Sequence, residues 1–188
     1  MNKRTSLKDQ KGFTLIEIAI VLVIIGLLIG GVLKGQSMIQ NAKVKRLVND
    51  IQGMQAAVLA FQDRYQMLPG DENSGTIPTA TDSTVGNRDG LITAAENAIE
   101  DLRLAGLISG TGIVPPSNAY NGTINIDNIV VNGSGTTFNK IIVTNIPGEI
   151  CQEIDTKYDD GLNNSGTIRG SAAYTTGTIV PNVAWIIQ

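Results

Sequence analysis

The stretch Lys11-Gly12-Phe13-Thr14-Leu15-Ile16-Glu17 leads directly into an apolar run that continues to Leu33. From Phe13 to Leu33 the run has 21 residues, and Glu17 is its one charged residue. As an α-helix this run would extend roughly 30 Å, which is the thickness of the hydrocarbon core of a bilayer. A carboxylate near the centre of a bilayer costs about 2.5 kcal/mol or more, so the position of Glu17 needs a physical explanation.

One interpretation is an uncleaved signal anchor whose Glu17 lies close to the lipid headgroups and stays hydrated. The identity of the residues around Glu17 favours a second interpretation. The string Gly-Phe-Thr-Leu-Ile-Glu follows a short lysine-bearing leader and precedes an apolar helix. This arrangement resembles the class III signal of type IV pilins and type II secretion pseudopilins. The resemblance is close from Lys3 to about Gly70 and only loose over the rest of the chain.

The resemblance implies a role for each of three residues. Prepilin peptidase would cleave between Gly12 and Phe13 on the cytoplasmic side, removing residues 1–12 as a leader, and the new amino terminus of Phe13 would be N-methylated. Residues 13–33 would form the transmembrane and filament-core helix. Glu17 would pair with the amino terminus of a neighbouring subunit during assembly. The pairing has a physical rationale, because a buried carboxylate is penalised strongly alone and much less beside a cation.

An amphipathic pattern follows the apolar run over residues 34–68 and predicts that the helix continues. Pro69 and Gly70 then end the pattern. The apolar stripe packs either in a coiled coil or, as we favour, against strands of the same chain. Its residues are spaced alternately by three and four positions: Val44, Leu47, Ile51, Met54, Val58, Phe61, Tyr65 and Leu68.

Composition excludes several classes of protein. The net charge is −3, so no nucleic-acid partner is predicted. The chain contains no histidine and a single cysteine, Cys151, which we expect to be a small buried residue. It can therefore form no intrachain disulfide and lacks the usual Ser-His-Asp, Cys-His and zinc constellations, so no catalytic residue is assigned.

A second motif, Asn87-Arg88-Asp89-Gly90-Leu91 through Glu96, fits positions three to twelve of an EF-hand-type calcium loop. The expected ligands are Asn87, Asp89, Leu91 and Glu96, and calcium is the one cofactor considered. The first position of the loop is Val85, which has no side-chain oxygen. The alternative is an ordinary Asp-Gly turn that leads into a helix and leaves Glu96 in solvent.

Residues 69–188 are predicted to form a globular β-rich head. Candidate strands lie at 123–131, 140–146 and 178–187, and a short helix is expected near 147–157. Three or four antiparallel strands laid on the helical stripe would make one two-layer core. The predicted fold class is α+β: a long N-terminal helix, half membrane-spanning and half amphipathic, packed on a small antiparallel sheet, as in pilins.

The resulting hypothesis is a structural subunit of a type IV pilus or type II secretion pseudopilus. Its expected partners are identical or related pilin subunits, the prepilin peptidase and methyltransferase, an inner-membrane assembly platform and membrane lipid. The protein would span the bacterial inner membrane once, with an extracytoplasmic head that enters a periplasmic or extracellular filament. One alternative is a bitopic membrane protein that forms no filament and whose head binds a ligand or calcium. An enzyme tethered by the helix has the least support.

Overall fold

The computed structural model describes residues 12–79, 82, 86–92, 95–128, 130–132 and 138–187, without the side chains of 95–97. The chain forms two compact units, Met1–Ala42 and Lys43–Gln188. The first unit contributes the start of helix α1 (Leu15–Tyr65), and the large apolar side chains between residues 12 and 42 are all exposed. The second unit contains every other element of regular structure in the described residues.

Helix α1 carries two different sequence patterns. One 18-residue window has a mean hydropathy of 2.9, so by length and composition α1 is able to cross a membrane. Its later turns bury one stripe, as the sequence predicted. The helix ends three residues before the predicted Leu68, because Gln66 adopts a left-handed conformation with φ 57°. The buried residues of the stripe are Val44, Leu47, Val48, Ile51, Met54, Ala57, Val58 and Phe61.

The second unit contains a four-stranded antiparallel sheet with the strand order β1-β2-β4-β3. The three candidate strands are present as β1, β2 and β4, whereas β3 was not predicted. With three residues, β3 is too short to show alternation, and it is a strand only because it pairs with β4. The strands are β1 (Ile124–Asp127), β2 (Lys140–Pro147), β3 (Ile168–Gly170) and β4 (Ile179–Ile186).

Pro181 lies in β4, which is an inner strand rather than the edge strand that a proline favours. The register explains why the proline is tolerated. Strand β3 pairs only with residues 183–185 of β4, and the β2–β4 register passes from Thr144↔Asn182 to Ile146↔Val180 without pairing Pro181. The missing N–H therefore removes no hydrogen bond from either pairing.

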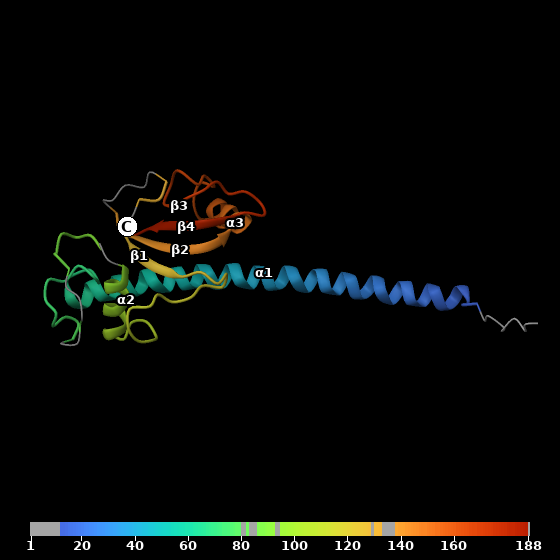
Figure 1. Ribbon diagram of the computed structural model, residues 1–188, viewed down its shortest axis with the longest axis horizontal. Helices are drawn as coiled ribbons and strands as arrows, with labels where there is room; N and C mark the ends of the chain where they lie inside the picture. The colour runs from blue at the N-terminus through green and yellow to red at the C-terminus, as the bar shows by residue number, and fades with distance from the viewer. Residues whose placement is uncertain are drawn as a thin grey trace, which may run out of the picture. The chain divides into compact units, whose positions relative to one another are not determined.

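One hydrophobic core joins the sheet to the stripe of α1, which confirms packing within the chain rather than in a coiled coil. Figure 1 shows the strands beside the part of α1 that belongs to the second unit. Phe61 and Ile126 are fully buried in this core. Helix α2 (Ala95–Leu104) packs beside β1 and adds Ile99 and Leu102. The α+β fold class is confirmed.

Helix α3 (Gly148–Tyr158) occupies the position predicted for a second short helix and contacts β2 and β4. It buries Ile150, Cys151 and Ile154. Burial raises the pKa of the Cys151 thiol to about 12. Since the thiolate is the reactive form, Cys151 is a packing residue, as expected.

Candidate functional site

The N-terminal motif begins with an exposed peptide bond. Gly12 has no atom within 4 Å of the position a Cβ would occupy, and the side chain of Phe13 is 84% exposed. Helix α1 starts two residues later, at Leu15. The Gly12–Phe13 bond therefore lies in an exposed segment before the start of the helix.

Glu17 closes a capping box at the start of α1, a feature that the sequence analysis missed. Its Oε2 accepts hydrogen bonds from the backbone N–H of Thr14 and from the Thr14 hydroxyl, both at 2.8 Å. The Glu17 N–H in turn donates to the hydroxyl oxygen of Thr14 at 3.3 Å. The Thr-x-x-Glu spacing in Thr14-Leu15-Ile16-Glu17 is the signal for this arrangement. In the single chain, Glu17 thus has partners within its own first turn.

The Pro-Gly-Asp junction after α1 and the predicted calcium loop dock on one another. The Gly86 N–H donates to the carbonyl of Glu72 and the Arg88 N–H to the carbonyl of Asp71. The carboxylate of Asp71, which is only 4% exposed, accepts the N–H groups of Asp89 at 2.9 Å and Gly90 at 2.8 Å. Asp71 therefore holds the Asp-Gly turn in place, as a side-chain anion often does for free backbone N–H groups.

Two of the residues proposed from the EF-hand pattern, Asn87 and Asp89, have other partners in this structure. The side-chain oxygen of Asn87 accepts the Asp89 N–H, and Asp89 accepts the Leu91 N–H together with the side-chain amide of Asn87. These are turn-forming bonds of exposed side chains. The side chain of Glu96 lies outside the described residues. Calcium binding by Asn87, Asp89, Leu91 and Glu96 stays a prediction.

Replacing Asp71 by alanine is expected to lower the free energy of unfolding by about 3 kcal/mol, because two backbone donors lose a charged acceptor. Urea unfolding of the detergent-solubilised chain, followed by fluorescence of the single tryptophan, Trp185, measures the change. The exposed Asp63 on α1 provides the control, and Asp63→Ala should change stability by less than about 0.5 kcal/mol. Equal effects of the two substitutions would contradict the role given to Asp71.

Three carboxylates form a cluster beside this junction: Glu72, Asp82 and Asp101. Glu72 and Asp101 are fully buried. Burial raises the pKa of Asp101 to about 9, and the facing carboxyl of Glu72 adds to the rise. Burial also raises the pKa of Glu72. No charged motif in the sequence pointed to this cluster, because its members are 10 and 19 residues apart and only the fold joins them.

A second acidic cluster contains Asp155, Asp159 and Asp160. Each of its carboxylates has hydrogen-bond donors within the chain. Asp155 accepts from the Gly161 N–H and the Tyr174 hydroxyl, and Asp159 accepts from the N–H groups of residues 167 and 168. Asp160 accepts the N–H of residue 162 and a serine hydroxyl. This cluster organises a turn, which is the ordinary role of such acids, and each of its carboxylates accepts hydrogen bonds.

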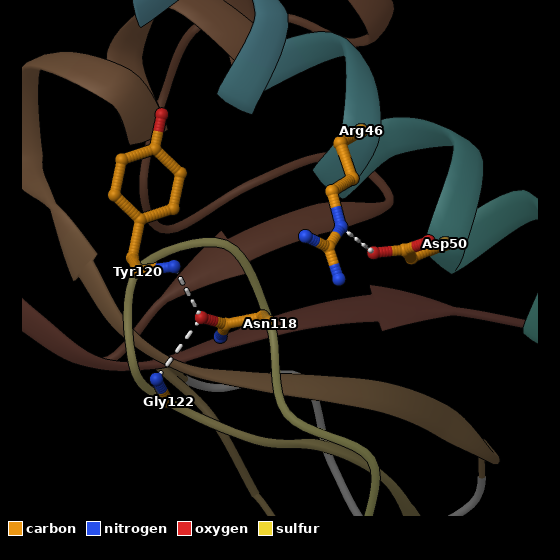
Figure 2. Close-up of polar contacts among 5 residues, drawn as sticks. All are labelled: Arg46, Asp50, Asn118, Tyr120 and Gly122. Carbon is orange, nitrogen blue, oxygen red and sulfur yellow. Dashed lines mark hydrogen bonds and ion pairs between the residues drawn. The ribbon is translucent and has the colours of Figure 1, made fainter.

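A groove of about 560 Å³ lies beside α1, bordered by Arg46, Asp50 and Arg103. Arg46 and Asp50 form an ion pair of 3.6 Å on the helix (Figure 2). Arg103 donates to backbone carbonyls of the loop after α2. The charged groups of the groove are therefore engaged within the chain.

Asn118 organises the loop next to this groove. Its side-chain oxygen accepts the N–H groups of Tyr120 at 2.8 Å and Gly122 at 3.0 Å (Figure 2), and its amide donates to the carbonyl of Thr144. These bonds fasten the loop to β2. Asn118 therefore has a structural role, and we assign no binding or catalytic role to these hydrogen bonds.

Comparison with known proteins places the first motif. Residues 7–33 match the family described as the prokaryotic N-terminal methylation motif. Among solved structures, the major type IV pilin PilA1 from Clostridium difficile is similar at 11% sequence identity and a TM-score of 0.42. That alignment covers 80% of this chain and 98% of the pilin. No curated protein sequence matches the chain.

Proposed function

We propose that this chain is a structural, non-enzymatic subunit of a helical filament of the type IV pilus or type II secretion pseudopilus class. The observation that carries the proposal is the N-terminal methylation motif over residues 7–33, which heads a helix able to span a membrane. Prepilin peptidase cleaves between Gly12 and Phe13, and Phe13 is then N-methylated. Before assembly, the subunit lies in the bacterial inner membrane with its head on the extracytoplasmic side.

The exposed apolar side chains of α1 support assembly through this helix. Residues such as Leu22, Leu27 and Leu33 are more than half exposed in the single chain. Each buried side chain of this type gains about 1.5–3 kcal/mol relative to water. Lipid satisfies these surfaces before assembly, and the same helices of neighbouring subunits, packed in the filament core, satisfy them afterwards.

The head supplies the exterior of the filament. Its core is complete within Lys43–Gln188, so each head folds around its own stretch of α1. An assembly that joins subunits through their apolar helices therefore requires no refolding of the heads. The proposal covers type IV pilus subunits and pseudopilus subunits alike, because both would assemble through their apolar helices.

A membrane protein that forms no filament is the second candidate. The capping box favours it, because Glu17 already accepts two hydrogen bonds from Thr14 and needs no partner subunit to remain hydrogen-bonded. Such a protein would keep its leader and its Met1.

The mass of the N-terminal peptide, from protein isolated from membranes, separates the two candidates. We expect a peptide that begins at Phe13 and carries one extra methyl group. Cells that lack the prepilin peptidase are the control and should yield the uncleaved chain. A Met1 terminus in peptidase-competent cells would overturn the filament proposal in favour of the simple membrane anchor.

A further inference from the structure

The carboxylates of Glu72 and Asp101 face one another in the interior of the second unit. Both side chains are fully buried. Both carboxylate oxygens of Glu72 and one of Asp101 have no hydrogen-bond partner. Buried polar oxygens in native proteins almost always have partners, and an unpaired buried carboxylate is strongly unfavourable. This arrangement leaves buried oxygens that a group from outside the chain could bind.

The second acidic cluster shows what a self-sufficient arrangement looks like in the same head. There, every carboxylate accepts hydrogen bonds from backbone or hydroxyl donors, as at Asp155 and Asp159. Glu72 receives none, and Asp101 receives one, from the Gly70 N–H at 2.6 Å. Within the described part of the chain, no lysine or arginine forms an ion pair with Glu72 or Asp101. A cation would supply the partner that these oxygens lack.

The separations of the oxygens suit a metal ion. One carboxylate oxygen from each of Glu72, Asp82 and Asp101 lies within 4.8 Å of the other two. Oxygens that bind one Ca²⁺ at 2.3–2.6 Å can be no more than about 5 Å apart. Asp82 is half-buried, and its Oδ2 atom is inaccessible to solvent. A set of ligands made up of carboxylate oxygens suits hard cations such as Ca²⁺ and Mg²⁺.

We propose that Glu72, Asp82 and Asp101 bind a divalent cation, with Ca²⁺ preferred over Mg²⁺. Three clustered carboxylates suit the larger ion, since Mg²⁺ gives up its water ligands reluctantly. The site differs from the EF-hand-type set of Asn87, Asp89, Leu91 and Glu96, whose described side chains already serve the turn. It lies beyond the filament proposal and does not depend on it.

The position of the cluster gives the cation a structural consequence. Glu72 follows the Pro-Gly-Asp junction at the end of α1, whereas Asp101 lies on α2. Gly70 permits their close approach, because it has φ 83° and a Cβ there would lie 3.0 Å from the backbone nitrogen of Ala98. A cation between Glu72 and Asp101 would therefore tie the junction to α2 and stabilise this end of the head.

The test uses the full chain in detergent, stripped of metal with a chelator. Titration calorimetry with CaCl₂ should show one ion bound per chain, and MgCl₂ should bind more weakly. At saturating Ca²⁺ the unfolding temperature, followed by Trp185 fluorescence, should rise by about 4 °C or more, because the ion binds only the folded head.

Glu72→Gln is the decisive variant, because it removes a charge without breaking any hydrogen bond of Glu72 in the structure. It should weaken Ca²⁺ binding at least tenfold and abolish the thermal shift. Its metal-free form should unfold at the same temperature as the metal-free wild type or higher, since one buried like charge is gone. Asp160→Asn, from the second cluster, is the matched control and should keep the full shift.

Two results would overturn the proposal. The first is a wild-type chain that shows neither heat of binding nor a thermal shift with Ca²⁺, which would mean that the two acids merely share a proton. The second is a shift that survives Glu72→Gln but disappears in Asp89→Asn, which would move the ion to the Asp-Gly loop. Neither result depends on whether the chain assembles into filaments, so the filament proposal is tested separately.

Discussion

Replacing Glu17 by glutamine is expected to abolish filament assembly while leaving cleavage at Gly12 and membrane insertion intact. Glutamine keeps the size of the side chain and can still accept the capping bond from Thr14, because a capping box takes Glu or Gln. What it loses is the negative charge. In an apolar filament core, that charge gains a favourable partner only in the axial register that places it beside the amino terminus of Phe13 in a neighbour.

Sheared-filament yield and electron microscopy measure the result, and processed subunit in the membrane fraction shows that the variant is inserted and cut. Glu17→Asp keeps the charge on a shorter side chain and should restore part of the yield. Normal filaments from Glu17→Gln would contradict the pairing and leave Glu17 only its capping role. Failure of cleavage in Glu17→Gln would place its effect before assembly.

The second large effect is expected at Phe61. Its side chain is fully buried, and its ring centroid lies 4.6 Å from that of Tyr65. Phe61→Ala should lower the free energy of unfolding of the head by about 3–5 kcal/mol, through lost burial and the cavity that remains. A small domain has a total stability of about 5–15 kcal/mol, so the loss is a large share of it.

Urea unfolding of the detergent-solubilised chain, monitored by the fluorescence of Trp185, measures this change in the free energy of unfolding. Leu59 lies on the same helix, is 51% exposed and makes a matched control. Leu59→Ala should change the free energy of unfolding by less than about 1 kcal/mol. Similar losses for the two variants would mean that the stripe of α1 is not the face that the head packs against.

Helix α1 was predictable because its two signals are local and repeat over many turns. The apolar run from Phe13 to Leu33 and the stripe from Val44 to Leu68 need no knowledge of the rest of the fold. The end of the helix was less accurate. Pro69 predicted that the helix ends after Leu68, but the chain turns at Gln66. Glutamine has no preference for the left-handed conformation that Gln66 adopts, so the sequence does not predict this end.

The sheet was predictable where alternation is long enough to read, as in Lys140–Pro147, and not where pairing alone makes the strand, as in Ile168–Gly170. The polar sites divide in the same way. The Thr14–Glu17 capping box is a local pattern of four consecutive residues, so it could have been predicted from the sequence. The bonds from Asp71 to the Asp-Gly turn span 18 and 19 residues, and no local pattern predicts them.

The amino-acid sequence by itself predicted the long N-terminal helix of this protein and the motif before it. A methylation motif, a membrane-length helix and an amphipathic stripe are properties of consecutive residues, because helix periodicity and hydropathy are local. The tertiary structure alone decided which acids of the head are solvated, which hold turns and which are left without partners. No pattern in the sequence distinguishes Glu72 and Asp101 from other acidic residues. Their proximity and burial arise only when α2 packs on the junction after α1, since charge interactions depend on distance and solvent exclusion rather than on sequence order.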